Sequence, residues 1–217
     1  MRRRHYLIAS SGLLASAISP FGAIADTDRG ASSIQAEAEP LRFEGSGATV
    51  TDEFDLEGGV TVAEAVHDGE SNFIADLVPT DDGREELLIN VIGTYDGASG
   101  ILAEEGTYLL DIDADGDWEI DLRQPRATDA DADTLPVELE DETPTWDGPF
   151  LFDGLGQARG THDGAGNFIV EILPQDERFS ELVFNEIGGF VGETTFDLEG
   201  VGYVTVDADG PWSITME

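Results

Sequence analysis

The stretch that decides the fold runs from Tyr108 to Leu122 and reads YLLDIDADGDWEIDL. Apolar residues alternate with acidic ones on both sides of a central Asp-Gly, as Trp118 and Ile120 show after it. A period of two predicts strands with one buried face and one wet face, as in an antiparallel sheet. The Asp-Gly predicts a hairpin at this point, because glycine readily adopts the positive φ that a tight turn requires.

The pattern recurs near the end of the chain, where residues 203–216 read YVTVDADGPWSITM, so that Tyr108 aligns with Tyr203. A second motif is also written twice. HDGESNFIADLVP begins at His67, and HDGAGNFIVEILP begins at His162. Self-similarity at a fixed spacing indicates that one structural unit occurs twice.

The two copies cover residues 40–125 and 136–217, and an acidic linker at 126–135 joins them. Clusters of Gly, Asp and Asn interrupt the apolar runs about every 8–12 residues, a spacing typical of sandwiches and barrels. No segment has the 3.6-residue period of a long amphipathic helix. The predicted fold is therefore all-β, with two tandem antiparallel β-sandwich units of jelly-roll-like type and about seven or eight strands each.

The first 25 residues are typical of an export signal, with a basic start, a mild apolar run and small residues before the mature chain. Arg3-Arg4 followed by His-Tyr-Leu resembles the twin-arginine export motif. The A-x-A pattern that ends at Ala25 predicts cleavage before Asp26, which would leave residues 26–39 as an acidic flexible tail. No apolar span of 18 residues follows, so we expect a secreted or extracellular protein without a transmembrane segment.

Charge sets the expected environment of the protein. The chain has 47 acidic residues against 10 arginines and no lysine, and loss of the signal peptide would leave 7 arginines and a formal charge of −40. Apolar runs such as ELLINVIG argue against disorder, so we expect a compact protein adapted to concentrated salt, which screens the repulsion. So strong a negative field argues against nucleic acid and anionic membrane surfaces as partners and leaves polycations and metal ions open. Cysteine is absent, which excludes disulfides and thiolate chemistry.

The repeated order F-x-L-E-G-G, H-D-G-x-x-N-F, N-x-I-G and G-T-Y-L-L-D-I-D-A-D-G-D-W resembles an uncharacterised β-sandwich repeat domain of exported proteins in halophilic archaea and some bacteria. The resemblance covers nearly all of the predicted mature chain. Residues 106–118 are also similar to the closing strands of pre-peptidase C-terminal domains, which are accessory modules of secreted enzymes. Both resemblances imply a module rather than a catalyst.

His67 and His162 are the only histidines after the predicted signal peptide. A histidine beside an aspartate can serve in acid–base catalysis or bind a ligand or metal. Neither histidine has a second His, a Cys or a repeated Ser nearby in the sequence. The alternative is structural: a strand-end His followed by an Asp-Gly turn, with Asn72 or Asn167 closing the loop through its side chain.

Two other places are candidate sites. Asp111, Asp113 and Asp115 follow the D-x-D-x-D-G start of a calcium loop, but Leu122 stands where the bidentate Glu should be. A decorated turn is the alternative, and we expect no cofactor, with calcium as the one ion to consider. Trp146 lies in ETPTWDGPF and would either stack on a sugar ring or pack against the other unit.

These observations predict a non-enzymatic binding or cell-surface-associated module, whose partner is an extracellular ligand or an envelope component. Two other classes remain open. A carbohydrate-binding module would use an exposed aromatic such as Trp146. A secreted hydrolase would gather polar groups around His67 or His162.

Overall fold

The computed structural model describes residues 39–217. The predicted signal peptide, its cleavage site at Ala25–Asp26 and the predicted tail up to residue 38 therefore lie outside the described residues. The described chain contains strands and turns but no helix, and none of it could cross a membrane as a long apolar helix.

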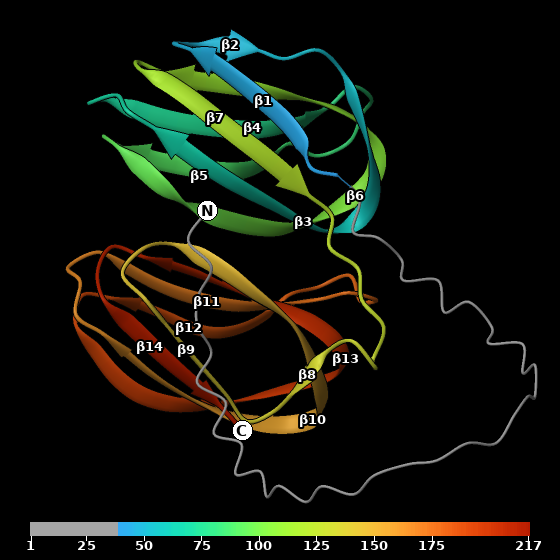
Figure 1. The fold of residues 1–217 in the computed structure, drawn as a ribbon, viewed down its shortest axis with the longest axis vertical. Coiled ribbons are helices and arrows are strands. Elements are labelled where there is room, and N and C mark those ends of the chain that lie inside the picture. The colour runs from blue at the N-terminus through green and yellow to red at the C-terminus, as the bar shows by residue number, and fades with distance from the viewer. Residues whose placement is uncertain (1–38) are drawn as a thin grey trace, which may run out of the picture. The chain divides into compact units, whose positions relative to one another are not determined.

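The strands form two separate sheets of seven strands each (Figure 1). The first sheet contains β1 (Leu41–Ser46), β2 (Thr49–Val50), β3 (Phe54–His67), β4 (Asn72–Pro79), β5 (Glu86–Ile92), β6 (Tyr95–Ala114) and β7 (Asp117–Arg123). The second contains β8 (Asp133–Thr134), β9 (Val137–Asp141), β10 (Thr145–His162), β11 (Asn167–Pro174), β12 (Glu181–Ile187), β13 (Phe190–Ala208) and β14 (Trp212–Met216). The structure thus confirms the predicted all-β class with two tandem antiparallel β-sandwich units.

Strands with matching sequence occupy matching places in the two sheets. The first sheet has the order β1-β7-β3-β6-β4-β5, and the second has the order β9-β14-β10-β13-β11-β12. The first residues of β10 pair with β13 as β2 pairs with β6. All pairs are antiparallel except the two-residue contact between β8 and β10. β8 lies inside the segment predicted as a linker.

The long strand β6 explains how one sheet makes a sandwich. Residues 95–108 of β6 pair with β3, and residues 108–114 pair with β4 and, at 111–112, with β2. The sheet can therefore fold over along β6 and enclose its apolar face. Fully buried side chains such as Phe73, Leu77 and Leu110 fill the first core, and Phe168, Ile172 and Ile214 fill the second.

The Asp115-Gly116 turn is not the hairpin that the sequence predicts. β7 pairs with β3 and β1 rather than with β6, so this turn carries the chain from one face of the sandwich to the other. Gly116 also lacks the expected positive φ. The glycine is required for a different reason, because a Cβ at Gly116 would lie 2.4 Å from the backbone nitrogen of Gly69. Two chain crossings thus touch at one end of the sandwich.

Candidate functional site

His67 and His162 end β3 and β10, and both side chains are fully buried. Each ring stacks on the phenylalanine that opens the following strand. The ring centroids of His67 and Phe73 are 4.6 Å apart, and those of His162 and Phe168 are 5.1 Å apart. The alternation of each strand turns its last residue inward, so the histidines lie at the edge of the two cores.

Nδ1 of each ring donates to a backbone carbonyl in the N-x-I-G motif. The acceptor is Gly93 O at 2.9 Å from His67 and Gly188 O at 2.9 Å from His162. A carbonyl can only accept, so Nδ1 carries a proton in both rings. The separation along the chain is 26 residues in both copies, and the contact joins the end of one strand to the turn before β6 or β13.

Nε2 of each ring faces an aspartate in the D-A-D-G turn. The Nε2–Oδ1 distance is 3.5 Å from His67 to Asp115 and 3.2 Å from His162 to Asp209. These are ion-pair distances, although neither Nε2 forms a hydrogen bond. A carboxylate only accepts, so a hydrogen bond at this place would need a proton on Nε2, and the structure has no such bond there.

The aspartate also closes the loop that follows the histidine. Asp115 accepts from the backbone N–H groups of Glu70 and Ser71 at 3.0–3.2 Å. These bonds, that of Ser71 above all, together with the charge of His67, hold the pKa of Asp115 below its usual value. In the second copy Asp209 accepts from Ala165 and Gly166 at 3.2 and 2.8 Å.

The role expected for the repeated asparagines is therefore taken by these aspartates. Asn167 reaches Asp207 of β13, with 3.5 Å between Nδ2 and Oδ2, and the loop after His162 is closed by Asp209 instead. An aspartate from another turn does more than an Asn within the loop, because it ties two chain crossings together.

The glycine of each H-D-G motif makes room for this contact. A Cβ at Gly69 would lie 2.1 Å from Asp115 Oδ1 and 2.5 Å from His67 Nε2. A Cβ at Gly164 would lie 2.0 Å from Asp209 Oδ1 and 2.3 Å from His162 Nε2. The backbone of the loop thus covers the ion pair, and any side chain there would push the pair apart.

We call each of these arrangements a His–Asp clamp. The first consists of His67, Gly93 and Asp115, and the second consists of His162, Gly188 and Asp209. Sequence reasoning picked out the histidines but missed their partners. The signal was present in the repeat itself, because the H-D-G, N-x-I-G and D-A-D-G motifs recur together in both copies.

A general base must hold a lone pair against the proton that it removes. In the clamps one ring nitrogen is bonded to a carbonyl and the other faces a carboxylate. The rings are also shielded from solvent. Both nitrogens of each ring thus face groups of the same sandwich.

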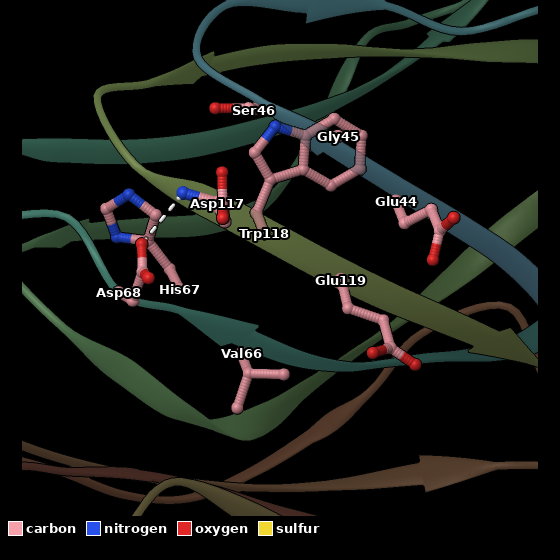
Figure 2. Close-up of a pocket in the computed structure, with 9 residues that line it drawn as sticks. All are labelled: Glu44, Gly45, Ser46, Val66, His67, Asp68, Asp117, Trp118 and Glu119. Atoms are coloured by element: carbon pink, nitrogen blue, oxygen red, sulfur yellow. Dashed lines mark hydrogen bonds between the residues drawn. The ribbon is translucent and has the colours of Figure 1, made fainter.

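One open depression adjoins the first clamp (Figure 2). It is lined by Glu44, Gly45, Ser46, Val66, His67, Asp68, Asp117, Trp118 and Glu119. Asp68 accepts there from the backbone N–H of Asp117 at 2.8 Å, the bond drawn in Figure 2. Trp118 is buried as part of the core, and its indole N–H donates to Gly47 O and so closes the turn there. The lining is acidic, so the depression favours cations over anions.

The three aspartates considered for calcium do not lie in one loop. Asp111 and Asp113 stand on the wet face of β6, opposite Asp76 and Ile74 of β4. Asp115 lies beyond the strand and is bonded within the clamp. Within residues 39–217, no three His, Asp or Glu side chains are grouped as a metal site.

Trp146 lies near the start of β10 and is partly buried. Its ring packs against Tyr203 at 6.0 Å between centroids, and its Nε1 donates to Glu64 Oε1 of the first sandwich at 2.9 Å. Trp146 thus contacts the other unit through its indole N–H, while its ring packs on Tyr203 of its own sandwich.

No model of a known protein family matches the chain, and no curated protein sequence matches it significantly.

Proposed function

We propose that this chain is an exported, non-catalytic tandem β-sandwich protein that works in concentrated salt as a binding or cell-surface-associated module. The observation that carries the proposal is the commitment of both histidines to structural contacts. His67 and His162 were the best candidates for chemistry in the sequence, and each ring bridges two turns of its own sandwich.

The geometry of the clamps favours a structural role over the hydrolase alternative. Acyl transfer and related hydrolyses need a nucleophile, a base and an orienting group in one place. Each clamp supplies the base and a carboxylate, but the carboxylate faces Nε2 and the carbonyl holds Nδ1. The fact that both sandwiches contain the same arrangement supports a structural role, because both need the same crossings tied together.

The carbohydrate-binding alternative would need another platform. Trp146 is held between Tyr203 and Glu64, so its ring is not free to lie flat on a sugar. No other observation favours sugar recognition over binding to protein or envelope.

Adaptation to salt is supported by the strand registers. Acidic residues stand directly opposite one another on paired strands, where like charges destabilise a sheet. The pairs are Glu44–Glu119, Glu57–Glu105, Glu64–Asp121, Asp76–Asp111 and Asp153–Glu199. Only some of these acids have an arginine nearby, such as Glu64 with Arg123 at 2.9 Å. At about 1 M salt the Debye length is about 3 Å, which removes most repulsion between exposed charges.

Export is tested by changing the predicted signal. In a halophilic host, wild-type protein should appear in the envelope or medium, and the variant Arg3→Lys/Arg4→Lys should remain folded inside the cell. Arg2→Lys is the matched control, because it removes one arginine and leaves the pair intact. Wild-type protein found only in the cytoplasm would contradict the proposal.

The module itself is tested with purified mature protein in molar KCl. It should sediment with isolated envelopes or bind a component of the culture medium, and it should show no turnover across a panel of ester, peptide and glycoside substrates. Turnover that His67→Gln or His162→Gln abolishes, in a variant that still folds, would contradict the non-catalytic assignment.

A further inference from the structure

The two sandwiches belong to one compact unit that contains all described residues, and they join through different faces. The first sandwich contributes joint face A, on the outer side of β3 and β6. The second contributes joint face B, on β10, β11 and β13. Face A consists of Val60, Val62, Ala98 and Leu102, and face B consists of Trp146, Leu151, Leu173, Val201 and Tyr203.

The joint is closely fitted as well as apolar. The backbone N–H of Ala98 donates to Pro144 O at 3.0 Å. A Cβ at Gly100 would lie 2.7 Å from Thr205 Cγ2 and 2.9 Å from Leu173 Cδ1. Glycine at position 100 therefore allows β6 to lie against the second sandwich, and a larger residue would hold the sandwiches apart.

A joint between unlike faces is directional. Each sandwich has the same strand order, so the second sandwich also has a face A and the first also has a face B. Neither takes part in the joint. Contacts of this head-to-tail kind can add further copies without limit unless something stops them.

The free face A of the second sandwich has polar residues in place of Val62, Ala98 and Leu102, three of the four apolar residues of the joined face. The strand registers set the equivalences, since Val62 pairs with Gly100 and Gln157 pairs with Thr195. The replacements are Val62 by Gln157, Ala98 by Glu193, Leu102 by Asp197 and Gly100 by Thr195. Val60 is matched by Leu155, which stays apolar and is 76% exposed.

These polar residues are bonded among themselves. Arg159 lies 3.5 Å from carboxylate oxygens of both Glu193 and Glu217, and it donates to Gln157 Oε1 at 3.2 Å. A copy docking here would have to displace these contacts and bury the charges, and buried charges without partners are costly. Thr195 adds a side chain at the one position where the joint requires none.

The free face B of the first sandwich changes less, because Leu173 and Tyr203 are matched by the apolar Val78 and Leu109. Trp146 is replaced by Val50, Leu151 by Asp55 and Val201 by Thr107. Thr107 Oγ1 donates to Asp55 Oδ1 at 2.7 Å, so a local polar bond stands where Leu151 and Val201 pack at the joint. Val50 is 57% exposed and cannot fill the space that an indole fills at the joint.

We propose that these replacements stop the array at two sandwiches. Each face of the joint accepts one kind of partner, which is a sandwich of this same type. An apolar face A accepts an apolar face B, and an apolar face B accepts an apolar face A. The polar residues on the two free faces prevent further copies from docking there. The protein therefore works as a monomer of two sandwiches. This inference does not depend on the proposed function.

The test restores one end at a time. The A-restored variant is Gln157→Val/Glu193→Ala/Thr195→Gly/Asp197→Leu, and the B-restored variant is Val50→Trp/Asp55→Leu/Thr107→Val. Each should stay monomeric alone, because its partner face is still polar. Mixed in 2 M KCl, they should form a 1:1 heterodimer, measured by size exclusion with light scattering.

A control variant makes the same change in net charge at positions that are not among the face A replacements. Asp113→Leu/Glu119→Ala in the first sandwich also removes two acids, and it should stay monomeric when mixed with the B-restored variant. If either restored variant fails to fold by circular dichroism, Gln157→Val/Glu193→Ala and Val50→Trp/Asp55→Leu replace them. A mixture of folded variants that stays monomeric would overturn the proposal, and so would wild-type protein that already assembles through these faces.

Discussion

Nε2 of His67 lies 3.5 Å from Oδ1 of Asp115, and Nε2 of His162 lies 3.2 Å from Oδ1 of Asp209. The two residues of each pair belong to different turns that cross between the faces of one sandwich. With Nδ1 bonded to a third turn, each ring holds three segments together. The clamp therefore explains why the H-D-G, N-x-I-G and D-A-D-G motifs recur as a set.

Replacing Asp115 by Asn should destabilise the fold, because the amide lacks the negative charge of the carboxylate. The backbone N–H groups of Glu70 and Ser71 and the charge of His67 stabilise that negative charge. The pKa of Asp115 is lowered in the folded state, so its stabilisation is present above the carboxyl's unfolded pKa of about 3.9 and is lost as the pH falls through the folded value. The melting temperature of Asp115→Asn should fall by several degrees at neutral pH and converge with wild type in acid. Asp113→Asn, on the wet face of β6, is the control and should change little. Equal effects of the two substitutions would show that the clamp is not what matters.

Gly69→Ala should cost about 1–3 kcal/mol of unfolding free energy, the usual range for overpacking a fitted site. Its Cβ would lie 2.1 Å from Asp115 Oδ1. Gly106→Ala is the matched control, because the nearest atom to its Cβ would be Tyr108 Cε2 at 3.4 Å, an ordinary contact. Urea titration in molar salt measures both, and a tolerated Gly69→Ala would mean that the loop does not cover the ion pair as described.

Asp76→Asn should stabilise the protein in low salt by about 0.2–1 kcal/mol, because it removes a like charge directly opposite Asp111. Burial, then the charges of Glu85 and Asp111, raise the pKa of Asp76 in the folded state. Because the pKa of Asp76 is raised in the folded state, the ionised side chain opposes folding once the pH is above the folded pKa, and it has no such effect below the unfolded pKa. The gain from Asp76→Asn is therefore expected at neutral pH and should vanish well below about pH 4. It should also shrink in molar salt. Chemical denaturation at 0.2 and 2 M KCl checks this, and a gain that grows with salt would be inconsistent with repulsion.

Trp146→Phe should cost about 1 kcal/mol, since the ring still packs on Tyr203 but the bond to Glu64 is lost. Trp146→Ala should cost more and should separate the unfolding of the two sandwiches into two calorimetric transitions. A single transition with an unchanged midpoint in Trp146→Ala would show that this residue contributes nothing to the joint. Retained binding to envelopes in either variant would fit its packing role.

The period of two and the repeat were enough to predict the fold class, and the expected seven or eight strands per unit include the seven found in each sheet. They could not predict the pairing of neighbours in sequence. YLLDIDADGDWEIDL has every local feature of a hairpin, yet β7 pairs with β3, because the apolar faces of β6 and β7 enclose the same core from opposite sides. Local turn chemistry does not distinguish a hairpin from a crossing.

The sequence alignment also slips by one residue at the tyrosines. Tyr108 pairs with Pro79, whereas Tyr203 pairs with Leu173, so the structural equivalent of Tyr203 is Leu109. One residue reverses the side of the sheet. Tyr108 accordingly packs in the first core and Tyr203 in the joint. The joint itself was not predictable, because its residues are ordinary apolar strand positions in the sequence.

The central claim is that the repeated histidines are structural, and the nitrogen resonances of the two rings test it most directly. The predicted mature chain has only these two histidines, so ¹⁵N spectra in 2 M KCl at neutral pH are simple to assign. The account predicts that Nδ1 of both rings carries a proton and that this proton exchanges slowly with solvent. The signal of the hydrogen-bonded Nδ1–H should disappear when the protein unfolds. An unprotonated Nδ1 in either ring, or free exchange with solvent, would contradict it.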